Sequence, residues 1–198
     1  DKFGDEVVRE LQSAIVTAGM MDLLEKHRRG EPVEELLRRF LRARKGKVAD
    51  ALKQVTDDLK WREEHNILQL SNSTASKILK GDVNPAGCAL HHSLFPHGLL
   101  GYDKQGRAIV YKWWSKPFNA KTLEEQGNIE LQDLINYNVW TMERTAAANH
   151  HRGQWVYVID LQGLAFSNIA SRKHVAYCRA LADADAHHFP ERLGRLFI

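Results

Sequence analysis

Apolar residues in the first third of the chain recur with the spacing of amphipathic helices. The three runs are Val8, Leu11 and Ile15; Val33, Leu36, Leu37, Phe40 and Leu41; and Val48, Ala51, Leu52, Val55 and Leu59. Each run places its apolar side chains on one face of a helix. Pro32 precedes the second run, where a first helical turn tolerates proline, and Gly46 can end that helix. The pattern predicts a helical module over residues 1–70.

A polar stretch follows this module. Residues 71–106 are rich in Ser, Asn, Gly, Pro and His, and Asn84-Pro85 and Phe95-Pro96 interrupt regular structure. We expect at most short helices in this stretch. We assign residues 71–94 to a linker and residues 95–198 to a second domain.

After Gly106 the pattern alternates between strands and helices. Short runs rich in β-branched and aromatic residues predict strands at 108–112 and 155–161, and a third strand that begins at Leu196. The two intervening helices are marked by Leu131, Leu134, Ile135, Val139 and Met142, and by Ile169, Val175, Cys178 and Leu181. This order predicts an α/β fold with a largely parallel, mixed sheet and crossover helices. We also expect the strand at 155–161 to be covered on both faces, because Val156, Val158 and Ile159 place apolar groups on both.

The composition is that of a globular protein. The chain has 198 residues, 43% of them hydrophobic, and a net charge of +3 that is too small to indicate nucleic-acid binding by itself. Cys88 and Cys178 lie far apart and suggest neither a disulfide framework nor a zinc site, so a reducing compartment is the simpler interpretation. No apolar stretch has the length that spans a bilayer, and residues 1–6 do not resemble a signal-peptide core. We therefore expect a cytoplasmic protein.

Motifs typical of enzymes are weak or missing in the sequence. Residues 101–108 superficially resemble a phosphate-binding loop, but Arg107 and Ala108 stand where Lys and Ser or Thr are needed. The histidine doublets at 91–92, 150–151 and 187–188 do not match a metal-ligand pattern, and we expect loop or surface roles for them. The basic run between Arg38 and Lys47 is weak evidence for a nucleic-acid module. We expect no enzyme, no cofactor, no metal site and no nucleic-acid partner.

Four motifs, in this order, resemble one family. They are LLRRFLRAR at 36–44 with WR at 61–62, DKQGR at 103–107, VIDLQG at 158–163 and FPERLG at 189–194. Each is weakly specific alone, but together they resemble the CRAL-TRIO lipid-transfer proteins. The resemblance implies a helical N-terminal module followed by a CRAL-TRIO lipid-binding fold. In that family a gate helix and further pocket walls follow the strand that begins here at Leu196, so we expect a truncated lipid-binding domain in a chain that ends at Ile198.

The resemblance also implies a headgroup site. In phosphatidylinositol-binding members the basic pair that closes the R-A-R-K motif, here Arg44 and Lys45, and the Glu of the Y-P-E-R motif, here Glu191, contribute to it. The chemistry agrees, because a guanidinium forks onto phosphate oxygens and a carboxylate accepts hydrogen bonds from inositol hydroxyls. From the residues alone, the basic run is a solvated helix face. Glu191 is then a turn residue or an ion-pair residue whose partner is Arg192 or Arg195.

The positions that resemble a choline site depart from the family. Members that also bind phosphatidylcholine carry small hydroxyl residues and tyrosines where this chain has Leu99, Val110, Trp155 and Tyr157, which we treat as candidate pocket-lining residues. Bulky Trp155 should fill volume that a choline phosphate needs, although aromatic rings can themselves hold a quaternary ammonium. We therefore expect phosphatidylinositol in preference to phosphatidylcholine.

The function implied is non-enzymatic transfer of a phospholipid, most simply phosphatidylinositol, between membranes that the protein contacts transiently. The alternatives are a non-transferring scaffold that docks on membranes or a GTPase through its basic helix, and a carrier of another small hydrophobic ligand. We expect the complete protein to be a monomer, and residues 1–198 alone to aggregate or bind hydrophobic dye and to transfer no lipid.

Overall fold

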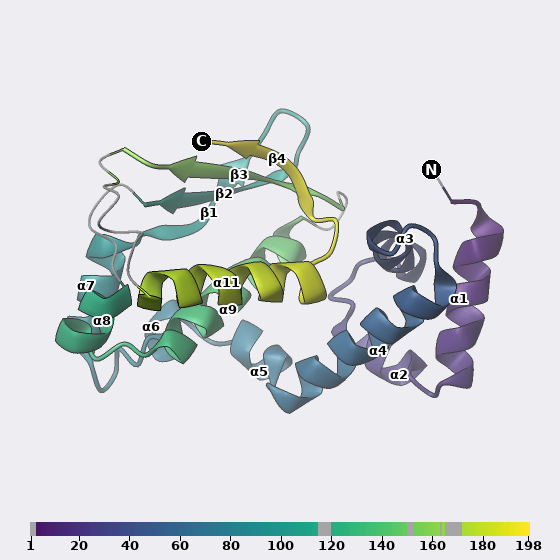
Figure 1. Ribbon diagram of the computed structural model, residues 1–198, viewed down its shortest axis with the longest axis horizontal. Helices are drawn as coiled ribbons and strands as arrows, with labels where there is room; N and C mark the ends of the chain where they lie inside the picture. Colours follow the sequence, from purple (N-terminus) through teal and green to yellow (C-terminus); the bar gives the residue numbers. More distant parts are fainter. Residues whose placement is uncertain (1–2, 115–119, 150–152, 163, 165–171) are drawn as a thin grey trace.

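The computed structural model describes residues 3–114, 120–149, 153–162, 164 and 172–198. The helices are α1 (Asp5–Thr17), α2 (Met21–His27), α3 (Val33–Ala43), α4 (Val48–Glu64), α5 (Ile67–Ser71), α6 (Ala75–Ile78), α7 (Pro85–Leu94), α8 (Ala120–Gly127), α9 (Leu131–Ala148) and α11 (Arg172–His188). The strands are β1 (His97–Tyr102), β2 (Ala108–Trp113), β3 (Trp155–Asp160) and β4 (Leu193–Phe197). Figure 1 shows α1–α4 as one lobe beside a second lobe that contains the sheet.

The first lobe is the predicted helical module. The apolar faces of α1, α3 and α4 pack into one core, and most residues of the three apolar runs are buried there. Helices α1, α3 and α4 confirm the three helices that the spacing predicts, whereas α2 was not predicted as a separate element. Helix α3 ends at Ala43, and Gly46, with φ of +81°, donates its backbone N–H to the Leu41 carbonyl at 2.8 Å. Gly46 thus closes the end of α3 as expected.

The second lobe contains a four-stranded sheet in the order β1-β2-β3-β4. Strand β1 is antiparallel to β2, while β2, β3 and β4 are parallel, which confirms the mixed, largely parallel sheet. Helices α9 and α11 lie along one face (Figure 1), and side chains of Val110, Trp155 and Tyr157 form a core there with Val139 and Met142 of α9. Among the described residues, no helix combines the length and apolar character that a bilayer crossing requires.

The expected two-sided cover of β3 is found in only part of the strand. Trp155, Val156 and Tyr157, which alternate between the two faces, are all buried, but Val158 and Ile159 remain partly exposed. Ile169, which marked the helix after β3, and Gly163 of the VIDLQG motif lie outside the described residues.

The polar stretch contains more regular structure than its composition suggests. It holds α6, α7 and strand β1, and buried Ile78 and Leu79 join a core with residues of α9 and α11. The expectation of at most short helices was wrong for β1. That strand carries two glycines and no clear alternation, so its sequence lacks a strand signal. The turn between Asp103 and Arg107 joins β1 to its hairpin partner β2, and the side chains of these two residues form an ion pair at 2.6 Å. The domain boundaries at residues 70 and 94 stay a prediction.

Candidate ligand-binding site

A tight turn joins α11 to β4 and carries Glu191. The backbone of Glu191 has φ of +60°, in the left-handed region, and its side chain is exposed. Phe189, before it, is buried against Trp155 with ring centroids 6.4 Å apart. Arg192, after it, donates to the Gly153 carbonyl at 3.1 Å, and its own carbonyl accepts the Trp155 N–H at 2.8 Å. Glu191 is therefore an exposed acid between two anchored residues.

The basic pair ends α3. Arg44 caps the helix and is partly buried, whereas Lys45 has φ of +56° and is exposed. Within the described part of the chain, the side chains of Arg44, Lys45 and Glu191 make no hydrogen bond or ion pair. The ion pair considered for Glu191 with Arg192 is not formed, because Arg192 pairs with Glu31 at 2.7 Å. These three charged groups remain available to a ligand.

An open hollow of about 510 Å³ lies between the two lobes, beside this turn. It is lined by Ala43, Arg44, Gln54, Trp155, Tyr157, Asp185, Ala186, Phe189, Pro190, Glu191, Arg192 and Leu193. The lining brings together four residues singled out from the sequence: Arg44, Glu191, Trp155 and Tyr157. Arg44 and Glu191 are far apart in the chain, so only the docking of the two lobes places them in one hollow.

The other candidates do not line this hollow. Lys45 lies next to Arg44 but is not part of the lining. Val110 is completely buried in the core on β2. Leu99 pairs with it on β1 and is 42% exposed. Tyr157, which does line the hollow, is 9% exposed, and its hydroxyl lies 2.8 Å from the sulfur of Met142.

The lining of the hollow combines charged and apolar residues. Arg44, Glu191 and Asp185 are charged groups of the lining, while Trp155, Phe189 and Leu193 are apolar. The volume of the hollow falls in the range of small-ligand pockets, about 300 to 1,000 Å³. A group that carries both phosphate and hydroxyls, attached to an apolar tail, fits this combination of surfaces.

Sequence reasoning missed two polar residues of the lining, Asp185 and Gln54. Asp185 accepts a hydrogen bond from Asn138 at 3.5 Å, and burial raises the pKa of its carboxyl. Gln54 of α4 donates to the carbonyls of Ala186 and His187, both at 3.1 Å, at the end of α11. Both residues are polar positions within helical runs, and no local pattern distinguishes them from solvated positions.

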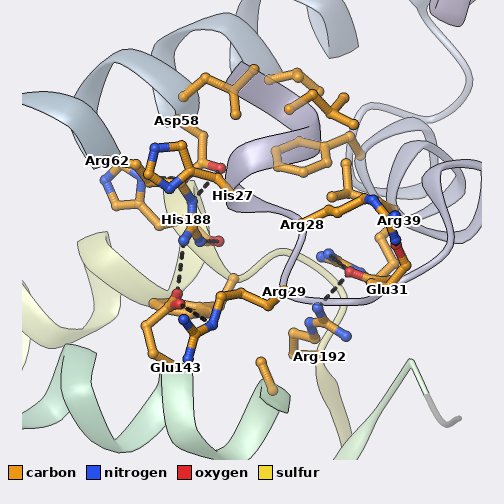
Figure 2. Close-up of a pocket in the computed structure, with 17 residues that line it drawn as sticks. His27, Arg28, Arg29, Glu31, Arg39, Asp58, Arg62, Glu143, His188 and Arg192 are labelled. Atoms are coloured by element: carbon orange, nitrogen blue, oxygen red, sulfur yellow. Dashed lines mark hydrogen bonds and ion pairs between the residues drawn. The ribbon is translucent and has the colours of Figure 1, made fainter. Parts of the chain in front are cut away.

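A cluster of buried charges lies beside the hollow, at the junction of the two lobes (Figure 2). It lines a small, partly enclosed cavity of about 30 Å³ and includes Arg29, Glu31, Arg39, Asp58, Arg62, Glu143, His188 and Arg192. Arg39 is only 4% exposed, so the interpretation of the basic run as a solvated face was wrong for this residue. The cluster was not predicted, since its members are distant in sequence.

Two histidines of the doublets also differ from expectation. His91 is 1% exposed, within a cluster of aromatic rings. His188 is partly buried, bonds Asp58 at 2.8 Å and stacks on Trp61. The surface role expected for the doublets was therefore wrong for these two, while the pair at 150–151 lies outside the described residues. Among the described residues, no group of three or more His, Cys, Asp or Glu could hold a metal ion.

Comparison with known proteins agrees with this architecture. The chain is 26% identical over 208 residues to "SEC14 cytosolic factor" of Candida glabrata, and 25% identical over 176 residues to "Phosphatidylinositol/phosphatidylcholine transfer protein SFH12" of Arabidopsis thaliana. The alignments cover 100% and 82% of this chain, but only 61% and 29% of those proteins. The crystal structure of Sfh5 has the same fold, with a TM-score of 0.64 at 13% identity over 99% of this chain and 71% of that one.

Two family models match the two lobes. The model described as "CRAL/TRIO, N-terminal domain" matches residues 16–57, within the helical module. The model described as "CRAL/TRIO domain" matches residues 93–198, which include the whole sheet and the turn that carries Glu191. The chain belongs to the CRAL/TRIO domain family.

Proposed function

We propose that this chain binds phosphatidylinositol in the hollow beside the turn at 189–192 and serves to move that lipid between membranes without chemical conversion. The observation that carries the proposal is the placement of Arg44 and Glu191 in one hollow, each without a side-chain partner among the described residues. Both residues come from the motifs that resemble the headgroup site of phosphatidylinositol-binding members.

The chemistry of the charged lining residues suits this headgroup. Arg44 offers a planar set of N–H donors to the phosphate, and Glu191 accepts hydrogen bonds from inositol hydroxyls. Lys45, exposed at the end of α3, adds a mobile positive charge near the phosphate. We assign the part of the lipid that follows the headgroup to the apolar residues of the lining.

Two features disfavour phosphatidylcholine. Trp155, at the start of β3, is 1% exposed. By the resemblance, choline-binding members have a small residue at this position. The hydroxyl of Tyr157 is directed at the Met142 sulfur rather than left free for a choline phosphate. We therefore favour phosphatidylinositol, although the name of the Arabidopsis relative includes both lipids.

Transfer requires that the lipid be shielded from water on its way. Burial of acyl chains is worth about 0.8 kcal/mol per methylene, so a two-chain lipid does not cross water unaided. We propose a monomeric protein that acts from the cytosol and touches membranes transiently. The Candida relative, named a cytosolic factor, supports that location.

A vesicle transfer assay with the full-length natural protein tests the proposal. Donor vesicles carry labelled phosphatidylinositol or labelled phosphatidylcholine, and we expect faster transfer of phosphatidylinositol. Arg44→Gln should lower the rate of phosphatidylinositol transfer. Lys53→Gln should not, because Lys53 is an exposed residue of α4 that pairs only with Asp57 among the described residues. Equal or greater transfer of phosphatidylcholine would overturn the choice of lipid.

Mass spectrometry of the protein purified from cells tests the rival functions. A stoichiometric phospholipid supports carriage. An empty hollow in a protein that still binds vesicles supports the membrane-docking scaffold, and a different hydrophobic molecule supports another cargo.

A further inference from the structure

Glu31 lies between two arginines from different lobes of the molecule. Its Oε2 accepts hydrogen bonds from Arg39 Nη2 and Arg192 Nη2, both at 2.7 Å, and its Oε1 accepts one from Arg39 Nε at 2.9 Å. Figure 2 shows the carboxylate between the two guanidinium groups. The side chains of Glu31, Arg39 and Arg192 are 12%, 5% and 10% exposed, so water screens these charges little.

The same groups hold the backbone on both sides of Glu191. Arg39 Nη1 donates to the Pro190 carbonyl at 3.0 Å, which fixes the residue before Glu191. Glu31 holds the guanidinium of Arg192, the residue after it, and the Arg192 carbonyl accepts the N–H of Trp155. Glu191 itself has a left-handed backbone and no side-chain partner in the described structure. Its place at the hollow is thus set by its neighbours.

We infer that Glu31 is a positioning residue for the ligand: acting through Arg39 and Arg192, it holds the turn at 190–192 so that Glu191 stays in the lining of the hollow. The lipid named in this inference rests on the proposed function. We use the name clamp for the contacts of Glu31 with Arg39 and Arg192 and of Arg39 with the Pro190 carbonyl, which do not depend on the lipid.

Charge is the reason that Glu31 matters here. Burial alone would raise the pKa of the Glu31 carboxyl, but the hydrogen bonds and charges of Arg39 and Arg192 outweigh burial and hold that pKa below its usual range. Without the negative charge, two nearly buried guanidinium groups would face each other and repel. The turn carries one of them, so the turn would move.

Glu31→Gln is the informative variant, because it keeps the size of the side chain and removes the charge. Glu63→Gln is a matched control: Glu63 of α4 pairs with Lys26 at 2.7 Å and with His27, so it joins two parts of the N-terminal lobe without touching the turn. Arg39→Lys is a second variant, which retains a cation beside Glu31 but loses the fork that reaches the Pro190 carbonyl.

The first measurement is amide hydrogen exchange in the full-length protein without lipid. We expect Glu31→Gln and Arg39→Lys to speed exchange about tenfold at the Trp155 amide, which donates to the Arg192 carbonyl, and Glu63→Gln to leave it unchanged. Unchanged exchange in the first two variants would overturn the clamp. This result is independent of any lipid, so the clamp is decided even if the protein takes up no phosphatidylinositol and the proposed function fails.

The second measurement is a double-mutant cycle on phosphatidylinositol uptake from vesicles. Glu31→Gln should weaken uptake about tenfold in the natural background and less than twofold when Glu191→Ala is already present. Equal losses in both backgrounds would show that Glu31 supports the fold generally and does not act through Glu191, which would overturn the inference.

Discussion

Arg62 of α4 donates a hydrogen bond to Glu143 of α9 at 2.8 Å, and both side chains are buried where the two lobes meet. The same guanidinium donates to Asp58 at 2.9 Å, and Arg29 lies 3.7 Å from the second oxygen of Glu143 (Figure 2). A buried ion is stable only when it is paired. The docking of the helical lobe onto the sheet lobe therefore depends on this group of charges.

Arg62→Met should lower the free energy of unfolding by about 3 kcal/mol. The substitution leaves the buried carboxylates of Asp58 and Glu143 without their shared cation, and removal of one partner from a buried pair typically costs about 3 to 5 kcal/mol. We take the lower end because His188 and Arg29 still lie near these acids. Urea unfolding followed by circular dichroism measures the change.

Lys53→Met is the control for this substitution. Lys53 also forms an ion pair on α4, with Asp57 at 2.5 Å, but both groups are exposed. Exposed pairs contribute little to stability, so the unfolding midpoint should hardly move. A similar loss in both variants would show that the removal of any cation from α4 is harmful and that the buried junction has no special role.

Glu191→Ala should impair phosphatidylinositol uptake and leave the lipid-free protein about as stable as before. Glu191 is exposed and unpaired in the described structure, so the carboxylate contributes little to the fold. Alanine retains a Cβ, so the strain of the left-handed backbone is the same in both proteins. A thermal melt of the lipid-free protein and a vesicle uptake assay give the two quantities. A large loss of stability with normal uptake would favour a purely structural role.

Much of the fold could be predicted because its elements carry strong local patterns. The helical spacing around Leu37 and Val55 and the apolar run that begins at Trp155 each specify one element. Strand β1 was not predicted, because a strand with glycines at positions 98 and 101 has low intrinsic strand propensity and is stabilised by pairing with β2.

Only those residues of the candidate site that belong to recognisable motifs could be predicted from the sequence. Arg44 and Glu191 stand out through resemblance to a family, but that resemblance does not show that Arg192 pairs with Glu31 rather than with Glu191. Contacts between residues so far apart in the chain depend on how the lobes dock. The periodicity of the sequence does not predict how the lobes dock. The roles of Glu31 and Asp185 could therefore be identified only from the structure.

Gly46→Ala should destabilise the protein by about 1 to 2 kcal/mol and disturb the end of α3 that carries Arg44. Gly46 has φ of +81°, where a Cβ is strained, and an added Cβ would lie 2.5 Å from Cε1 of Phe3. Gly98→Ala on β1 is the control, since that position does not have a positive φ and no atom lies within 4 Å of an added Cβ. Thermal melts compare the two, and equal melting temperatures would contradict the prediction.

His91 should make the protein sensitive to acid. Its ring is buried among aromatic side chains, with the Tyr137 centroid 4.8 Å away, and neither ring nitrogen has a hydrogen-bond partner in the described structure. Burial, aided by His92, lowers the pKa of His91 from 6.5 to about 3. The unfolded chain therefore takes up a proton before the folded protein does. This contribution to stability is fully present above about pH 6.5 and is lost as the pH falls from there towards 3.

Replacement of His91 by phenylalanine tests the sign of this effect. Between pH 7 and pH 5, one such histidine accounts for a loss of about 2 kcal/mol in the free energy of unfolding. In His91→Phe that loss should shrink by about this amount, because the new ring stays uncharged at every pH. His92→Phe, at the exposed neighbouring position, should keep the natural dependence. Urea midpoints of the three proteins at both pH values give the answer. If His91→Phe loses as much stability between pH 7 and pH 5 as the natural protein does, the acid sensitivity arises elsewhere.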